Sequence, residues 1–175
     1  MSTRYSLPLI LLHWLAVPAM LAAFIIGEVM EDLPRGPEKI SVMGWHILAG
    51  LTVAALLLPR IAIRLRGVPP MHGEAAFWEA GLARAAHLVM YAVMLLLPLT
   101  GLLSILAGTR TVPVLGLFEL PALFPLSWLH EAMEEVHEAV ARVFLVTLVM
   151  HVAATLWHVL VRRDGVLRRM LPGRN

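Results

Sequence analysis

The last hydrophobic stretch of the chain carries four histidines, separated by seven, fourteen and seven residues: His130, His137, His151 and His158. Phe144 fills the remaining position of this series. Seven residues return a helical side chain to within about 20° of its starting direction, so the five share one stripe. Imidazole is costly in hydrocarbon and is seldom kept there without a partner. The stripe therefore indicates that something tall and metal-containing lies beside this helix face.

The composition is typical of a membrane protein. Of 175 residues, 59% are hydrophobic and only 15% are charged, with a mean hydropathy of +0.80. The chain has no cysteine, which excludes disulfides, thiolate metal sites, cysteine-held iron–sulfur clusters and covalent haem attachment. Eight histidines remain as the obvious soft ligands. The net charge of +2 gives no reason to expect a nucleic-acid partner.

Four apolar runs approach or exceed the ~20 residues that cross a bilayer core. The predicted spans are 7–27, 40–58, 85–107 and 136–161. The first run could be mistaken for a signal peptide, but it is long, carries His13 in its core, and its removal would leave an odd number of spans. We therefore expect a single all-α membrane domain over residues 1–175, folded as a four-helix transmembrane bundle.

Basic residues orient the predicted bundle. Ten of them lie before the first span, between the second and third, or after the fourth: Arg4, Arg60, Arg64, Arg66, Arg84, Arg162, Arg163, Arg168, Arg169 and Arg174. The opposite side has three basic residues, Arg35, Lys39 and Arg110. It has nine acidic residues: Glu28, Glu31, Asp32, Glu38, Glu119, Glu131, Glu134, Glu135 and Glu138. The positive-inside rule then predicts that both termini are cytoplasmic. The outer loop from about 108 to 135 is apolar, and it either folds back over the mouth of the bundle or lies on lipid.

The depth of each histidine in these alternating spans predicts two pairs. His13 and His151 lie at similar depth in the inner half, nine residues from Arg4 and eleven from Arg162. His46 and His137 both lie in the outer half. The sequence therefore predicts two bis-histidine sites, each shared between helices.

Haem is the group that best explains these pairs. His137 and His151 lie fourteen residues apart, which is ~21 Å along a helix and leaves room for two haems with Phe144 between them. Gly50 and Gly101 either let a porphyrin approach the backbone or serve ordinary helix packing. Two imidazoles leave iron without an open coordination position, which favours electron transfer over oxygen binding.

His87 and His158 each lie within four residues of an arginine at the inner ends of their spans. They are therefore predicted to be shallow. Either they are interfacial residues without a role, or they bind a quinone headgroup and exchange protons with its carbonyl oxygens. Tyr91 and Trp157, on the same predicted helices, are candidates to flank the quinone ring.

Two further ionisable groups stand near the outer pair. Arg142 lies five residues inside His137 in an apolar span, where an unpaired arginine is costly. It pairs either with a haem propionate or with Glu28 or Glu138. His130 is expected to be a loop-end residue, with contact to an outer propionate as the minor alternative.

The order and spacing of several motifs resemble the bacterial cytochrome b561 family almost from end to end. The motifs are Tyr5-Ser6, His13-Trp14, Trp45-His46, Gly50, Ala86-His87-Leu88-Val89-Met90-Tyr91, Leu97-Pro98, Gly101, His137-Glu138, His151, His158 and Asp164-Gly165-Val166-Leu167-Arg168-Arg169-Met170. No single motif is very specific, but the combination is.

The resemblance implies a multi-pass protein of the bacterial inner membrane with two b-type haems. Carried over residue by residue, it makes His46 and His137 ligands of the outer haem and His13 and His151 ligands of the inner haem. It leaves His87 and His158 for the quinone region. A member of this family is a superoxide oxidase, which takes an electron from superoxide and reduces ubiquinone. The wider family includes haem subunits of hydrogenases and formate dehydrogenases.

One feature departs from the superoxide oxidase pattern. A surface that collects a small anion should be locally positive, yet the outer side carries three basic residues against nine acidic ones. Lys39, Arg35 and Arg110 are the candidates to attract superoxide. The alternative hypothesis is an electron-transfer module that serves a dehydrogenase, a hydrogenase or another redox partner docked on either face.

Overall fold

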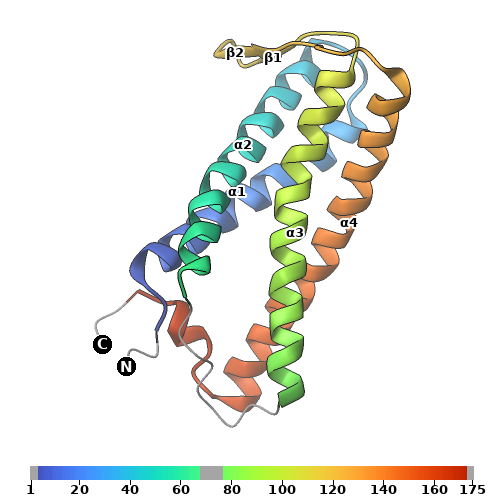
Figure 1. Ribbon diagram of the computed structural model, residues 1–175. Coiled ribbons are helices and arrows are strands. Elements are labelled where there is room, and N and C mark those ends of the chain that lie inside the picture. Colours follow the sequence, from blue (N-terminus) through green and yellow to red (C-terminus); the bar gives the residue numbers. More distant parts are fainter. Residues whose placement is uncertain (1–3, 68–76, 173–175) are drawn as a thin grey trace.

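The computed structural model describes residues 4–67 and 77–172. Its four long helices are α1 (Leu7–Asp32), α2 (Pro37–Leu65), α3 (Phe77–Ala107) and α4 (Ser127–Trp157). The chain continues from α4 into a π-helix, η1 (His158–Arg162), and a 3₁₀ helix, η2 (Leu167–Met170). Figure 1 shows the four helices in one elongated bundle with both chain ends at the same end, which we call the termini end. A small two-stranded sheet, β1–β2, lies at the opposite end, called here the hairpin end.

Each of the four helices contains a segment long and apolar enough to cross a membrane, with mean hydropathies between 1.9 and 2.4. The predicted four-helix membrane architecture is therefore confirmed. The helices are longer than the predicted spans, since α2 continues to Leu65 and α4 begins at Ser127. Hydropathy marks only the part in hydrocarbon, whereas backbone hydrogen bonding continues into the polar ends.

The helices pack as two helical hairpins. Within the described residues, α1 runs alongside α2 and α3 runs alongside α4. The backbones of α2 and α3 approach each other much less. An apolar core joins all four helices near the middle of the bundle; it consists of Ala16, Met20, Val53, Leu57, Val93, Met94 and Phe144. Phe144 is 2% exposed and is the one buried residue of α4. The outward faces carry exposed apolar side chains, as expected of surfaces that contact lipid.

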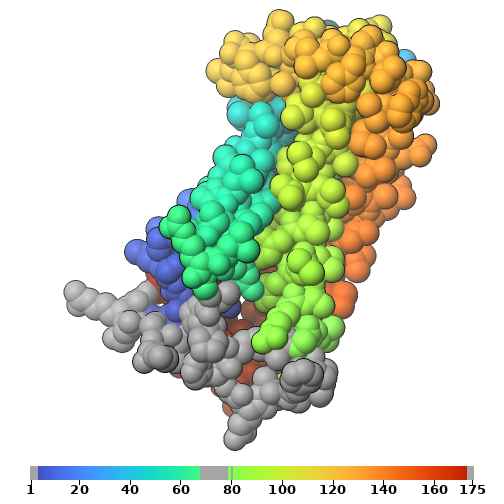
Figure 2. Space-filling model, in the orientation of Figure 1, coloured from blue at the N-terminus to red at the C-terminus, as the bar shows by residue number. Residues whose placement is uncertain are grey.

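The segment between α3 and α4 folds back on the bundle, which is the first of the two expected alternatives. Strands β1 (Val112–Val114) and β2 (Phe118–Leu120) pair antiparallel. Leu115 and Gly116 turn the chain with φ of 52° and 72°. Val114 is fully buried, and Figure 2 shows the segment as a continuous layer over the hairpin end. The strands were not predicted, because the turn lacks the Asn-Gly or Asp-Gly signal typical of tight hairpins.

The C-terminal segment returns to the beginning of α1. The indole N–H of Trp14 donates to the carbonyl oxygen of Met170 at 2.6 Å. The backbone N–H of Tyr5 donates to the carbonyl oxygen of Arg169 at 3.2 Å, and the Arg169 guanidinium lies 5.4 Å from the Tyr5 ring centroid. These contacts tie the two ends of the chain together and fix the path of residues 158–170.

We predict that Gly44→Val loosens the hairpin. A Cβ at Gly44 would lie 3.2 Å from the backbone nitrogen and side chain of Leu115, and overpacking of this kind costs about 1–3 kcal/mol. Roughly tenfold faster proteolytic cleavage within residues 112–120 in detergent is expected. Gly36→Val is the matched control, since nothing lies within 4 Å of its Cβ position. Equal cleavage rates in the two variants would contradict the contact.

Candidate functional site

Imidazoles from different helices meet at two levels of the bundle. At the hairpin end, the rings of His46 on α2 and His137 on α4 have centroids 6.0 Å apart and planes at 74°. Nearer the termini end, the rings of His13 on α1 and His151 on α4 have centroids 6.4 Å apart and planes at 72°. These are the two pairs that the depth argument predicted. Each pair joins one helical hairpin to the other.

The ring spacing fits a metal ion held between two imidazoles. A metal–nitrogen bond of about 2 Å on each side, plus about 1.2 Å from each nitrogen to its ring centroid, places the centroids about 6.4 Å apart. The observed separations of 6.0 and 6.4 Å lie at or slightly below this value. Both pairs therefore have the spacing that two imidazoles sharing one metal ion would have.

The second nitrogen of each hairpin-end ring is already engaged. The Nδ1–H of His46 donates to the carbonyl oxygen of Ala23 at 2.9 Å. The Thr100 hydroxyl donates to the Leu96 carbonyl at 2.8 Å, so its oxygen accepts the Nδ1–H of His137 at 3.0 Å. Such bonds fix the tautomer and leave the Nε2 lone pair for a metal. Thr100, which is only 5% exposed, was not singled out by sequence because a threonine in an apolar helix has no distinctive pattern.

Two glycines seat these rings against the neighbouring helix. A Cβ at Gly27 of α1 would lie 3.1 Å from Cε1 of His46, and one at Gly101 of α3 would lie 3.2 Å from Cε1 of His137. Gly101 therefore makes room for an imidazole ring, where sequence reasoning had offered porphyrin approach or helix packing. At Gly50, nothing lies within 4 Å of the Cβ position. Gly27 was missed because sequence alone does not show which residue faces it.

His87 lies deeper than its position near an arginine indicated. Its ring centroid is 6.0 Å from that of His151, and its Nδ1–H donates to the carbonyl oxygen of Ala83 at 2.6 Å. The expectation of a shallow His87 is therefore wrong, because α3 brings it to the level of His13 and His151. Ring spacing alone permits His151 to share a metal with either of these two partners.

Arg60 of α2 stands beside this group. Its guanidinium lies 5.3 Å from the Tyr91 ring centroid and is hydrogen-bonded to Tyr91, while Arg64 lies 5.6 Å from the same ring. Arg60 interacts electrostatically with His13 and His151. Sequence reasoning used Arg60 only to orient the bundle. Tyr91, predicted to flank a quinone, lies next to both guanidiniums.

The other quinone candidates are placed at the end of α4. The Nδ1–H of His158 donates to Oδ2 of Asp164 at 2.5 Å, a partner that sequence reasoning did not identify. Trp157 is 57% exposed. The structure thus separates the predicted quinone residues into one group around His87 and Tyr91 and another around His158.

The remaining candidates at the hairpin end have local partners. Arg142 forms an ion pair with Glu138 on the exposed surface of α4, which is one of the alternatives weighed for it. The Nδ1–H of His130 donates to the Ser104 carbonyl oxygen at 2.9 Å. His130 therefore has a structural role at the start of α4.

The three residues proposed to attract superoxide differ in their hydrogen bonding and exposure. The Lys39 ammonium donates to the Leu33 carbonyl oxygen at 3.1 Å. Arg35 and Arg110 are exposed. All three belong to the hairpin end, on the same side as the His46–His137 pair.

Comparisons with known proteins agree with this arrangement. The family profile of prokaryotic cytochrome b561 matches residues 4–173. The chain is 27% identical over 173 residues to the Escherichia coli protein named "Cytochrome b561 homolog 1", covering 98% of each. It is also 27% identical over 173 residues to the Yersinia pestis protein named "Probable superoxide oxidase CybB", again covering 98% of each. Four apolar helices, facing histidines on three of them and a match over nearly the whole chain lead to one conclusion: this protein belongs to the prokaryotic cytochrome b561 family of membrane haem proteins.

Proposed function

We propose that the chain is a dihaem b-type cytochrome that oxidises superoxide at the hairpin end and reduces ubiquinone near the termini end. The observation that carries the proposal is the pair of imidazole contacts at two levels, each spaced for one iron. The similarity to a relative named as a probable superoxide oxidase supports this reaction. The proposal also includes cytoplasmic termini and a location in the bacterial inner membrane.

His46 and His137 would hold one haem b, and His13 and His151 the other. Haem held there would supply one-electron chemistry, and two histidine ligands from the chain would disfavour oxygen binding at its iron. The bonds to Ala23 and Thr100 hold the imidazoles of the first pair in the ligating tautomer. The chain therefore provides two fixed sites for an electron at different depths.

Residues between the two levels exclude water. Phe144 and Leu57 are 2% and 0% exposed and lie in the core that joins all four helices. The electron would therefore pass between the two levels through an apolar layer that contains no water path across the described part of the bundle. Arg60 adds a positive charge near His13 and His151, and such a charge stabilises an electron at that level. Transfer from the hairpin end to the termini end is then the favourable direction.

The proposed reaction balances over two turnovers of the donor. Two superoxide anions are oxidised to two molecules of O₂, and the two electrons reduce one quinone to a quinol with two protons from the termini side. Arg35 and Arg110 are the exposed cations placed to attract superoxide. His87, beside His151, and His158 are the residues proposed for the quinone headgroup.

The charge of the hairpin end favours one alternative function. Nine acidic residues against four basic ones, with Arg142 included, give this end a negative field, which would attract a basic redox protein more readily than an anion. In that case the same residues would form an electron-transfer module for a partner.

The two functions are distinguished with purified protein in detergent. The protein should be supplied with a superoxide flux and a soluble ubiquinone, while haem absorbance and quinol formation are followed. The superoxide oxidase should reduce both faster than superoxide dismutates spontaneously, and added superoxide dismutase should abolish the reduction. Haem that stays oxidised under the flux would reject superoxide as the donor and favour the partner-dependent module.

Single histidine variants test the ligand assignment. We expect His137→Ala and His151→Ala each to reduce the haem content from two per chain to one, because each removes an axial ligand from a different pair. His130→Ala is the control and should retain both, since His130 is bound to Ser104. The measurement is the pyridine haemochrome per chain.

The comparison of His13→Ala with His87→Ala resolves the second pair. Loss of one haem is expected in the first variant, and retention of both in the second. The reverse result would make His87 the partner of His151, which their ring spacing also permits.

Arg60→Gln should lower the midpoint potential of the haem at the termini end. Removing a charge that acts on His13 and His151 is expected to shift the potential by roughly 50 mV, or about 1 kcal/mol. Arg64→Gln is a matched control, because Arg64 contacts the same tyrosine but its charge acts on His87 and not on the other two histidines. Redox titration followed by absorbance measures both haems, and equal shifts in the two variants would contradict the assigned role of Arg60.

A further inference from the structure

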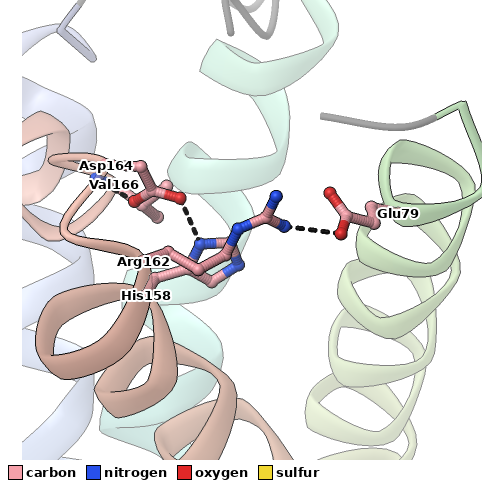
Figure 3. Close-up of polar contacts among 5 residues, drawn as sticks. All are labelled: Glu79, His158, Arg162, Asp164 and Val166. Atoms are coloured by element: carbon pink, nitrogen blue, oxygen red, sulfur yellow. Dashed lines mark hydrogen bonds and ion pairs between the residues drawn. The ribbon is translucent and has the colours of Figure 1, made fainter. Parts of the chain in front are cut away.

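After the end of α4 the chain reverses, and this reversal places the carboxylate of Asp164 next to the ring of His158. The last turns widen into the π-helix η1, and Arg163 then adopts a left-handed conformation with φ 53° and ψ 34°. A non-glycine residue in this conformation is uncommon, and π-helical turns are rare and frequently found at functional sites. The result is a reversal of the chain that brings Asp164 beside His158 (Figure 3).

The two oxygens of Asp164 have different partners. Oδ1 accepts the backbone N–H of Val166 at 3.2 Å, and Oδ2 accepts the Nδ1–H of His158 at 2.5 Å. Slight burial opposes ionisation of Asp164, but the hydrogen bonds from His158 and Val166 outweigh it and hold the pKa of the carboxyl below its usual range. The bond from the Val166 N–H to Asp164 is sufficient to stabilise the turn that follows Arg163. The bond to His158 therefore needs a separate explanation.

The other charged groups around His158 balance each other. Arg162, on the same turn, donates to Oε1 of Glu79 on α3 at 2.5 Å. Figure 3 shows the Arg162 guanidinium directed toward Glu79, while the Asp164 carboxylate is directed toward the imidazole. Of these charged groups, Asp164 is thus the one whose charge acts directly on the ring of His158.

We propose that Asp164 and His158 form a proton-donating pair for the quinone, with Asp164 as the positioning residue. This inference rests on the proposed function. Asp164 holds the His158 ring by Nδ1 and leaves Nε2 to face the acceptor. An ionised carboxylate beside the ring stabilises the imidazolium form, which is the form that can give a proton from Nε2 to a quinone oxygen.

The step balances for each quinone reduced. The Nε2–H bond of protonated His158 breaks and an O–H bond forms on the quinone oxygen, once for each of the two electrons delivered. His158 then regains a proton from water on the termini side. Asp164 stays ionised throughout, as its pair with His158 requires.

Asp164→Asn is the decisive variant. Its amide oxygen can still accept the Val166 N–H, so the turn should be retained, whereas the negative charge beside His158 is lost. Haem content, haem spectrum and the rate of haem reduction by superoxide should be unchanged. The rate of quinol formation should decline at a lower pH than in the wild type, because the carboxylate that faces the imidazole no longer carries a charge. At pH 8 the rate should be about tenfold lower.

Two further variants make the result specific. Glu79→Gln also removes a negative charge nearby but leaves the bond between Asp164 and His158 in place, so its pH profile should shift less than that of Asp164→Asn. His158→Gln should be slow at every pH, and adding Asp164→Asn to it should cause no further loss, because the two residues act as a unit. If Asp164→Asn alone fails to fold, His158→Gln still decides the question, because a wild-type rate and pH profile in that variant would overturn the pair.

The possible failures are distinguishable. A wild-type protein that reduces its haems but forms no quinol would overturn both the proposed quinone reaction and the pair that depends on it. A wild type that forms quinol, with Asp164→Asn showing the same pH profile, would overturn the pair alone. A uniform loss of rate with no change of profile would assign Asp164 a purely structural role.

Discussion

The cost of placing imidazoles inside an apolar bundle governs the rest of this structure. A polar group that is buried without a hydrogen-bond partner destabilises the fold, whereas one with a partner does not. Each ring therefore needs a defined acceptor and a defined space. Ala23 and Thr100 supply the acceptors at the hairpin end. Gly27 and Gly101 supply the space, because a Cβ at either position would lie only 3.1 or 3.2 Å from Cε1 of a ring. Helix packing at this level is thus set by the histidines.

The same constraint explains why the bundle consists of two helical hairpins. Each pair of facing histidines spans the boundary between α1–α2 and α3–α4. A flat group held between two facing histidines would require the helices that carry them to stay apart, and the backbones of the two hairpins approach each other sparingly. Phe144 and its neighbours join them near the middle of the bundle. The core therefore holds the two histidine levels at a fixed separation.

Most of the architecture could be predicted from the hydropathy of the sequence and the spacing of its residues. The four spans, the shared face of His137, Phe144 and His151, and the two histidine pairs follow from helical geometry and depth, which act locally along the chain. The sequence could not show which residues of different helices or loops lie next to each other. Nothing in a single chain indicates that Gly27 lies under His46, that Arg60 stands beside His13, or that Asp164 turns back to His158. His87 was placed too shallow because distance from an arginine measures position along one helix and not its tilt against the others.

The two ends of the bundle differ in a way that gives the protein a direction. At the hairpin end the acidic residues outnumber the basic ones, and the ring nitrogens of His46 and His137 are bonded to neutral oxygens. At the termini end Arg60 acts on His13, His87 and His151. A negative field destabilises an added electron and a positive one stabilises it. On the proposed function, this difference would draw an electron toward the termini end, where the proposed His158–Asp164 pair would supply the proton that follows it.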